Sequence, residues 1–390
     1  MRPLRICVVA ACPVPYPRGT PIRVTRLSEA VARLGHEVDL VTYATSEGTM
    51  DPAVRIHRIR DVPGIRVGRP GPSVGKLAVL DPLLALRFRR LLREHSFDVI
   101  HAHHYEGLLI ASLVRDRKIP LIYDAHTVLE TELPTYARWI PTAAVRAVGA
   151  VLDRRLPSRA NFIVAVSEPL RDHLVARRAA PPERVRVIGN GVELGTFPVL
   201  QAAPNPPSDG GTIVYAGNLA PYQGIPHLLE GFRTVLERRP LASLRIITTS
   251  SFEPFERMAR ELRVRHRIEI EGATIESLGA ALGRAHVAVN PRPKCEGVPQ
   301  KNLNYMAAGI PLVAFTDSLH PARDGETGRG VRPVSGKALG QVILELLERP
   351  EERRRLAASA RAALDPDYTW SGQAGRLVQL YEELSPRAAG

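Results

Sequence analysis

The sequence predicts an α/β protein with two doubly wound parallel-sheet domains, and three observations support this prediction. Continuous apolar runs such as RICVVAA and GTIVYAG are typical of strands buried on both faces. Helical stretches alternate with these runs along most of the chain. The alternation is interrupted in residues 198–211, where Pro, Gly and polar residues predict a linker between two domains.

The first βαβ unit can be followed residue by residue. The strand RICVVAA leads through PRGT into the helix PIRVTRLSEAVARLG, and HEVDLVTYA is the second strand. Thr20 suits the N-cap of this helix, Pro21 its first position and Gly35 its C-terminal stop. A basic helix over about 76–95 then precedes the strand FDVIHAH, and a further helix covers about 106–116. The strands IPLIYDAH, NFIVAVS and RVRVIGNGV continue the pattern.

The pattern restarts after the linker. The strands expected there are GTIVYAG, LRIITTS, RIEIEGA, HVAVNP and IPLVAF. Helices are expected near 225–238, 254–264, 275–284, 299–308, 336–347, 350–364 and 371–384. The predicted domains are 1–197 and 212–368, with residues 369–390 forming a helix that packs back toward the first domain. Two Rossmann-like domains would face each other across a cleft, and ligands would bind at the carboxyl ends of the strands.

Composition places the chain among globular proteins of a reducing compartment. It has 390 residues, of which 44% are hydrophobic, and only three cysteines, Cys7, Cys12 and Cys295, without metal-ligand spacing. The opening MRPLRICVVAAC resembles a signal peptide, but its apolar run is short and PVPYPRG follows in place of a cleavage site. No apolar stretch reaches the ~18 residues of a spanning helix. We therefore expect a cytoplasmic protein.

The formal net charge of +13 favours anionic partners. Nucleic acid is the weaker interpretation, because no nucleic-acid-binding motif or aromatic-interleaved basic run is found. Residues 136–160 and 83–93 mix apolar and arginine side chains, as do amphipathic helices on anionic bilayers. The alternative is that their apolar sides pack on the domain. A peripheral position on the inner membrane face therefore stays a hypothesis.

Three loops of the first domain carry candidate chemistry. PRGT precedes a helix N-terminus, which binds anions, although an ordinary tight turn explains it equally well. The segment HAHH, with His101, His103 and His104, suggests a metal site or residues lining the cleft; no carboxylate cluster follows at metal-ligand spacing. His126 ends a strand and faces the expected cleft, where an imidazole can hydrogen-bond a sugar hydroxyl. Asp124 and Glu130 are interpreted as structural or loop-capping.

The second domain contributes the stretch VNPRPKCEGVPQKNLNYMAAGIP. Arg292 and Lys294 follow a strand, and Pro299 can start a helix that carries Lys301 and Asn304 on one face. The helix N-terminus and these cations would attract a diphosphate. Glu296 in the preceding turn can accept hydrogen bonds from sugar hydroxyls. A capped surface helix with solvated charges is the alternative.

Taken in order, these segments resemble a retaining glycosyltransferase of family 4, with the two-domain GT-B fold. The resemblance runs from LSEAVARLGHEVDLVTY through YDAHTVLETELP and YAGNLAPYQGIPHLLEGF to EGVPQKNLNYMAAGIPLVAF. It implies transfer of a sugar from a nucleotide sugar to a glycan or lipid-linked acceptor, with retention of configuration and without a metal or other cofactor. Cell-envelope or exopolysaccharide synthesis is the expected setting.

The resemblance also implies roles for particular residues. His126 matches the active-site histidine, and Glu296 matches the first acid of the E-x7-E pattern, which holds the sugar. The first domain would be the acceptor side and the second the donor side. The residues implied in donor binding are Gly19, Thr20, Gly217, Asn218, Gln223, Arg292, Gly297, Val298, Pro299, Lys301 and Asn304.

Two departures from the family pattern stand out. Asn304 replaces the second acid of E-x7-E, which binds ribose; losing a charged hydrogen bond predicts a cost of about 1 kcal/mol. Asn218 and Gln223 replace the usual Arg and Lys that contact the diphosphate, and Arg292, Lys294 and Lys301 are the expected substitutes. Two alternatives therefore stay open: a GT-B sugar-nucleotide 2-epimerase, and a non-catalytic sugar-nucleotide-binding relative.

Overall fold

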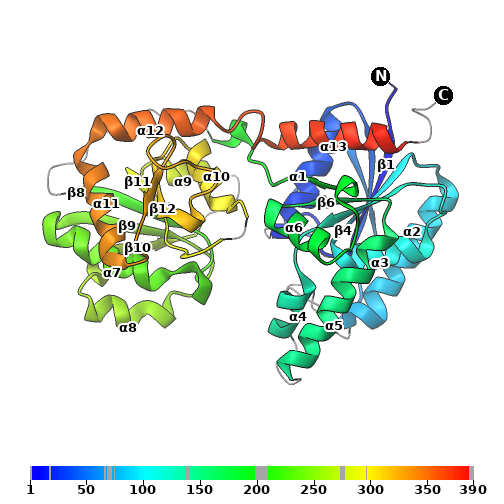
Figure 1. The fold of residues 1–390 in the computed structure, drawn as a ribbon, viewed down its shortest axis with the longest axis horizontal. Helices are drawn as coiled ribbons and strands as arrows, with labels where there is room; N and C mark the ends of the chain where they lie inside the picture. Colours follow the sequence, from blue (N-terminus) through cyan, green and yellow to red (C-terminus); the bar gives the residue numbers. More distant parts are fainter. Residues whose placement is uncertain are drawn as a thin grey trace. The chain divides into compact units, whose positions relative to one another are not determined.

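The computed structural model describes residues 2–16, 19–65, 67, 73, 75–136, 141–197, 210–272, 277–295 and 297–385. The chain divides into two compact units (Figure 1). The first comprises Met1–Asn190 with Trp370–Gly390, and the second comprises Gly191–Thr369. The division falls at Asn190, ahead of the expected linker. Residues 198–209 of that linker lie outside the described residues, and Gly210 and Gly211 already belong to a strand.

The first unit is built on a seven-stranded parallel sheet in the order β3-β2-β1-β4-β5-β6-β7. The strands are β1 (Arg5–Ala10), β2 (Glu37–Thr42), β3 (Val54–Arg58), β4 (Val99–His103), β5 (Leu121–Ala125), β6 (Phe162–Ala165) and β7 (Val185–Val187). The expected strand pattern holds, and β3 was missed. It is an edge strand whose alternating VRIHR sequence leaves charged side chains partly exposed, so it lacks the apolar run used to find the others.

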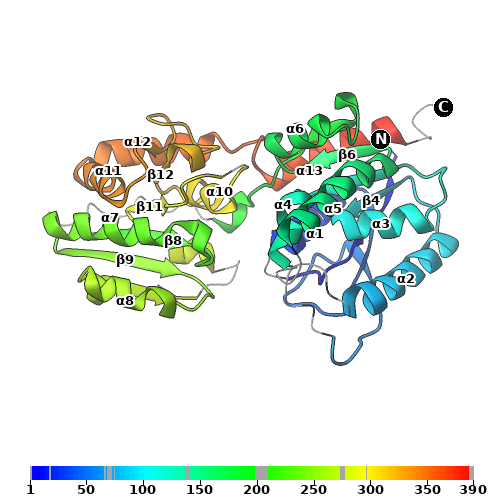
Figure 2. The ribbon, with the colours of Figure 1, turned by 60° about the horizontal axis from the view of Figure 1, so that its bottom comes forward.

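Helices cover both faces of this sheet. They are α1 (Gly19–Arg33), α2 (Asp81–Glu94, continuing a π-helical turn at Lys76–Leu80), α3 (His104–Val114), α4 (Leu129–Tyr136), α5 (Thr142–Arg155), α6 (Glu168–Ala176) and α13 (Trp370–Leu384). One core lies under α1 and α13, with Leu27, Leu377 and Tyr381. The other lies under α2 and α3, which run side by side (Figures 1 and 2), with Leu84 and Phe88.

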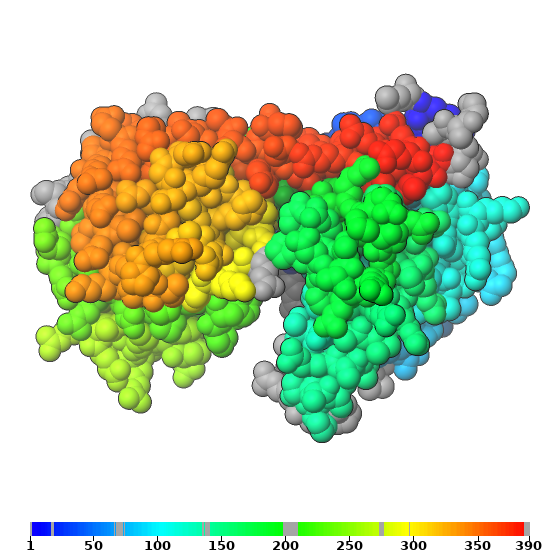
Figure 3. Space-filling model, viewed as in Figure 1, coloured from blue at the N-terminus to red at the C-terminus, as the bar shows by residue number. Residues whose placement is uncertain are grey.

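The second unit has a six-stranded parallel sheet in the order β10-β9-β8-β11-β12-β13. The strands are β8 (Gly210–Ala216), β9 (Leu241–Ile247), β10 (Ile268–Glu271), β11 (Val287–Asn290), β12 (Leu312–Phe315) and β13 (Arg329–Val331). The helices are α7 (Ile225–Arg238), α8 (Glu253–Glu261), α9 (Leu278–Leu282), α10 (Gln300–Ala307), α11 (Gly336–Glu348) and α12 (Pro350–Ala362). The face seen in Figure 3 exposes α11 and α12 (orange).

Two apolar cores again sandwich the sheet. One packs α7 and α11 through Phe232 and Ile343, and the other packs α10 through Leu303 and Met306. The predicted fold class, two doubly wound parallel-sheet domains, is confirmed. Among the described residues, no helix combines the length and apolar character needed to cross a bilayer.

Each strand order reverses direction at one place, between β1 and β4 in the first sheet and between β8 and β11 in the second. Open α/β sheets bind ligands beside such a reversal, at the carboxyl ends of the strands. The loops after β1 and β8 are therefore the positions where the fold itself favours a site. Both loops carry residues singled out in the sequence.

Candidate functional site

In the first unit, the predicted site residues meet at the carboxyl ends of three adjacent strands. Thr20 lies in the first turn of α1, and its Oγ1 is 3.2 Å from Nδ1 of His126, which follows β5. Nε2 of His126 is 3.3 Å from Nδ1 of His103, the last residue of β4. The strand register explains this convergence, because His103 stands directly opposite Asp124 in the β4–β5 pairing.

Asp124 is the buried centre of this cluster. Its side chain forms an ion pair with Arg23 of α1, in which Nη2 of Arg23 is 2.9 Å from Oδ2 of Asp124 and both side chains are almost completely buried. Arg23 also donates to the carbonyl oxygens of Ile188 and Gly189, at 2.8 and 2.7 Å. Burial alone would raise the pKa of Asp124, but Arg23 and the surrounding imidazoles hold it well below its usual range. Asp124 is thus ionised and fully paired.

The segment HAHH suggested a metal as one interpretation, and the donor geometry argues against it. One ligand atom each from His101, His103 and Asp124 lies within 4.8 Å of the others. However, Arg23 already places a fixed positive charge against both carboxylate oxygens. A cation bound here would face that guanidinium at close range and would have to displace its hydrogen bonds. The donor set therefore does not fit a metal ion.

Two imidazoles beside Asp124, those of His126 and His103, favour the neutral form. Burial lowers the pKa of His126, although Asp124 acts in the opposite direction. Burial likewise lowers the pKa of His103 well below its usual value. His104, the next residue along the chain, instead adopts a left-handed φ of 62° and bonds Glu106 through Nδ1 at 2.8 Å. His126 can thus present a neutral imidazole nitrogen at the strand ends.

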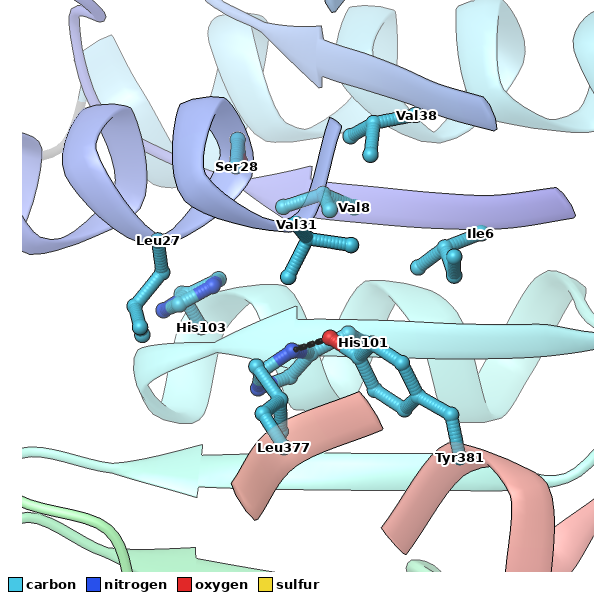
Figure 4. A pocket seen from close by; sticks show the side chains of 10 residues that line it. All are labelled: Ile6, Val8, Leu27, Ser28, Val31, Val38, His101, His103, Leu377 and Tyr381. Carbon is cyan, nitrogen blue, oxygen red and sulfur yellow. Dashed lines mark hydrogen bonds between the residues drawn. The ribbon is translucent and has the colours of Figure 1, made fainter. Parts of the chain in front are cut away.

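A small cavity lies beneath this cluster, between the sheet, α1 and α13 (Figure 4). Its volume is about 10 Å³, close to the space that one water molecule needs. The lining side chains in Figure 4 are Ile6, Val8, Leu27, Ser28, Val31, Val38, His101, His103, Leu377 and Tyr381. The cavity is too small for a sugar or a nucleotide, so it belongs to the packing of the unit.

In the second unit, Lys301 reaches from α10 to the loop after β8. Its Nζ is 2.6 Å from Oε1 of Gln223 and 3.1 Å from the hydroxyl of Tyr215, and it lies 4.3 Å from the centre of the Tyr215 ring. One turn along α10, the hydroxyl of Tyr305 accepts a hydrogen bond from the backbone N–H of Ala216. This contact fixes α10 against the end of β8 and so directs Lys301 toward the loop.

The surroundings of Lys301 disfavour the positive charge of its ammonium group. Its enclosure among neutral groups lowers the pKa of Lys301 to about 7, and the positive charge of Arg292 adds to that effect. Arg292 stacks over the ring of Tyr222 at 5.0 Å and donates to the carbonyl of Lys294. Two cations therefore lie near each other at this loop, and an anion would relieve their repulsion.

Two glycines shape the same loop. Gly217 has a φ of 147°, and a Cβ there would lie 3.3 Å from Nζ of Lys301, so the glycine leaves the ammonium group room. Gly224 has a φ of 74°, and a Cβ there would lie 2.1 Å from the carbonyl oxygen of Pro291, which only glycine permits. The loops after β8 and β11 are therefore packed backbone to backbone beside Lys301.

The start of α10 supplies the remaining predicted donor residues. Pro299 is the N-cap of α10, and Gly297 and Val298 precede it in the chain. Asn304 accepts a hydrogen bond of 3.4 Å from Gln300, whose amide also donates to the carbonyl of Gly191. Glu296 lies outside the described residues.

Comparison with known proteins decides the family. Residues 17–196 match the family model described as Glycosyltransferase Family 4, and residues 210–349 match the one described as Glycosyl transferases group 1. The chain belongs to glycosyltransferase family 4. A relative of this family-4 chain is the MMP alpha-(1->4)-mannosyltransferase of Mycolicibacterium hassiacum, 26% identical over 95% of this chain and 96% of that protein. A D-inositol 3-phosphate glycosyltransferase of Nocardioides is 28% identical over 93% and 84% of the two chains.

Solved structures agree on the fold of this glycosyltransferase. Sucrose-phosphate synthase from Thermosynechococcus elongatus superposes with a TM-score of 0.79 at 21% identity, covering 99% of this chain and all of that one. HepE of Anabaena, solved in complex with UDP-glucose, gives 0.70 at 14% identity, covering 97% of this chain and all of that one. The GT-B fold is thereby established.

The loop after β8 of this glycosyltransferase contacts a cation from a neighbouring helix. Asn218 and Gln223 bond each other, with Nε2 of Gln223 3.2 Å from Oδ1 of Asn218, and Gln223 receives Lys301 on its other side. The structure thus places a cation from α10 at the loop where the family pattern has two of its own. Within each unit, the predicted residues converge: Thr20 with His126, and Gly217, Asn218 and Gln223 with Lys301. Gly19 opens α1 next to Thr20.

Three further residues, Arg23, Asp124 and Tyr215, join these clusters without having been assigned a role in the site. Asp124 had been interpreted as structural or loop-capping, and its place at the strand end was the available signal. Arg23 and Tyr215 offered no signal of their own, because their partners lie 101 and 86 residues away along the chain.

Proposed function

We propose that the chain is a retaining, metal-independent glycosyltransferase that moves a sugar from a nucleotide-sugar donor to a glycan or lipid-linked acceptor. The observation that carries the proposal is the position of Lys301, 2.6 Å from Gln223 and beside Gly217. Burial lowers the pKa of Lys301 and so disfavours its charged form. A bound diphosphate would stabilise the ammonium form through charged hydrogen bonds.

The proposed chemistry is largely electrostatic. The sugar–phosphate bond breaks, and the departing diphosphate is stabilised by Lys301, Arg292 and the backbone N–H groups at the start of α10. The acceptor hydroxyl attacks the anomeric carbon from the face that the diphosphate leaves, and its proton passes to the diphosphate. That geometry retains the configuration and requires no protein nucleophile.

The other residues have proposed roles in holding the sugar and the nucleotide. Glu296, Gly297 and Val298 bind the sugar, His126 hydrogen-bonds one of its hydroxyls, and Asn304 contacts the ribose. HepE of Anabaena supports a nucleotide-sugar donor for the fold, since it was solved with UDP-glucose. The mannosyltransferase relative supports transfer of a hexose, and cell-envelope or exopolysaccharide synthesis is the setting we propose.

A donor panel with purified protein tests the proposal. We expect nucleotide release only when an acceptor is present, an anomeric configuration in the product identical to that of the donor, and no loss of rate in EDTA. Exchange of the sugar C2 proton with solvent would instead support a 2-epimerase. Donor binding without turnover across the panel would support a non-catalytic relative and overturn the transferase proposal.

We further propose that α5 places the first unit on an anionic bilayer. This helix lies on the face seen in Figure 3 (blue-green). Val148 and Val151 are 56% and 51% exposed on it, and Arg154 and Arg155 at its end are also exposed. The other candidate, α2, buries Leu84, Phe88 and Leu91 in the core but exposes Leu86. Trp139 and Ile140 lie outside the described residues.

Liposome flotation tests the role of α5. Binding is expected to anionic vesicles, to weaken with salt and to fall when Val148 and Val151 are both changed to serine. Equal partitioning into neutral and anionic vesicles would contradict the electrostatic mechanism.

A further inference from the structure

A continuous network of polar contacts runs through the buried part of the first unit, from Thr20 at the strand ends to Tyr381 on α13. Three of its links are hydrogen bonds, Thr20 to His126, Asp124 to His101 and His101 to Tyr381. The remaining link is a close contact of 3.1 Å between Nε2 of His126 and Oδ1 of Asp124. The partners are far apart along the chain, and His101 and Tyr381 are separated by 280 residues. Figure 4 shows the last link, with the Tyr381 hydroxyl against the imidazole of His101.

Asp124 decides where the imidazole protons lie. Oδ1 receives Nε of Arg23 at 3.0 Å and faces Nε2 of His126 at 3.1 Å. Oδ2 receives Nη2 of Arg23 at 2.9 Å and faces Nε2 of His101 at 3.2 Å. An ionised carboxylate only accepts hydrogen bonds, so the proton of each imidazole is expected on Nε2, the nitrogen that faces Asp124. Nε2 of His126 also lies 3.3 Å from Nδ1 of His103, which can accept from it. In a neutral ring the other nitrogen, Nδ1, is then an acceptor.

The two Nδ1 atoms have different partners. Burial raises the pKa of Tyr381 well above its usual value, so its phenol keeps its proton and donates it to Nδ1 of His101 at 2.6 Å. Among the described residues, the hydrogen-bond partner of Nδ1 of His126 is the hydroxyl of Thr20, at 3.2 Å and near the strand ends. Of the two rings, His126 is the one whose acceptor nitrogen lies where a substrate hydroxyl can reach it.

We propose that Asp124 is the positioning residue for His126, that it fixes His126 as the Nε2–H tautomer, and that Tyr381 anchors the far end of the same network. Nδ1 of His126 then accepts a hydrogen bond from a sugar hydroxyl and does not donate one. A donor sugar that offers a hydroxyl at this point is bound, and one with an acceptor-only substituent there, such as fluorine, is disfavoured. This use of His126 rests on the proposed function, whereas the tautomer does not.

The test combines ¹⁵N NMR of histidine-labelled protein with kinetics. An unprotonated imidazole nitrogen resonates far downfield of a protonated one, and His126→Asn assigns the signal. In the wild-type protein without substrate we expect His126 to be unprotonated at Nδ1. Because this arm needs no turnover, it remains decisive if the transferase proposal fails.

Two variants extend the test to the network. Asp124→Asn turns one acceptor into an amide donor, so His126 is expected to shift toward the Nδ1–H tautomer, and kcat is expected to fall about tenfold or more. Tyr381→Phe leaves the Arg23–Asp124 pair intact, so it tests the same network if Asp124→Asn does not fold. It is expected to shift the His101 and His126 signals and to lower kcat about twofold to tenfold, with KM for the donor unchanged.

Tyr123→Phe is the matched control, since Tyr123 is a buried tyrosine of β5 that packs in the opposite core of the sheet. It should change neither the His126 signal nor kcat. A protonated Nδ1 on His126 in the wild type would overturn the proposal. So would variants of Asp124 or Tyr381 that fold and retain both the wild-type signal and the wild-type kcat.

Discussion

The two candidate clusters, one in each unit, handle charge in opposite ways. In the first, Arg23 and Asp124 neutralise each other, and every oxygen of the carboxylate is paired. In the second, the described partners of the Lys301 ammonium group are neutral oxygens, and Arg292 adds a second positive charge nearby. The charges of the first cluster are therefore balanced, whereas the second carries unbalanced positive charge. Under the proposed function, the first cluster binds the sugar through His126 and the second binds the diphosphate through its cations.

The largest expected effect comes from breaking the first cluster. Arg23→Met leaves the buried carboxylate of Asp124 without its positively charged partner, which should lower the free energy of unfolding by about 3–5 kcal/mol. Replacing both residues, as Arg23→Met with Asp124→Leu, should recover most of that loss, because no buried charge remains. Chemical denaturation measures both variants, and equal stability of the single and double variants would contradict the account.

Lys301→Ala tests the second cluster. Loss of charged hydrogen bonds worth about 1.5–3 kcal/mol should weaken donor affinity about tenfold to a hundredfold, with little effect on folding. Lys337→Ala is the matched control, since Lys337 is an exposed lysine on α11 of the same unit. Calorimetric titration of a nucleotide sugar provides the affinities. An unchanged affinity would refute the idea that Lys301 replaces the cations missing at Asn218 and Gln223.

Donor affinity should also depend on pH with a defined sign. Since the pKa of Lys301 in the free protein is about 7, the ammonium form dominates below that pH and the neutral amine above it. A diphosphate prefers the cation, so affinity should be greatest below pH 7 and decline, by up to about tenfold per pH unit, as the pH rises above it. Lys301→Arg stays charged and should remove this decline.

The smallest effect is expected at Asn304. Restoring the acid of the family pattern, Asn304→Glu, should tighten donor binding by about 1 kcal/mol, a several-fold change, if the carboxylate reaches the ribose. Measuring the affinities for UDP and for uridine, which lacks phosphates, separates a ribose contact from a phosphate contact. Weaker binding in the variant would place Asn304 near the phosphates instead.

Local sequence patterns were sufficient to predict most of the fold. Buried parallel strands such as β1 and β8 are recognisable because each contains a continuous run of mostly apolar residues. The strands β3 and β13 were not predicted. β3 is a half-exposed edge strand, and β13 is only the three-residue segment RGV. In the candidate site, the position of His126 at a strand end predicts its role, whereas the loop from Gly217 to Gln223 is predicted from the resemblance to family 4.

Partners brought together by tertiary structure could not be predicted in this way. Arg23 meets Asp124 from a helix 101 residues earlier, and Tyr381 reaches His101 from the last helix. No periodic pattern in the sequence predicts either contact. That Lys301 replaces the missing cations is a prediction from charge alone, whereas its contact with Gln223 depends on the packing of α10 against β8.

The most direct test of the contrast between the clusters is the number of protons taken up when the donor binds. Calorimetry at pH 8 in buffers of different ionisation enthalpy gives this number. Because Lys301 is largely neutral at that pH and becomes cationic beside a diphosphate, we predict uptake of nearly one proton by the wild type and none by Lys301→Arg. Equal uptake by the two proteins, or none by either, would contradict the account.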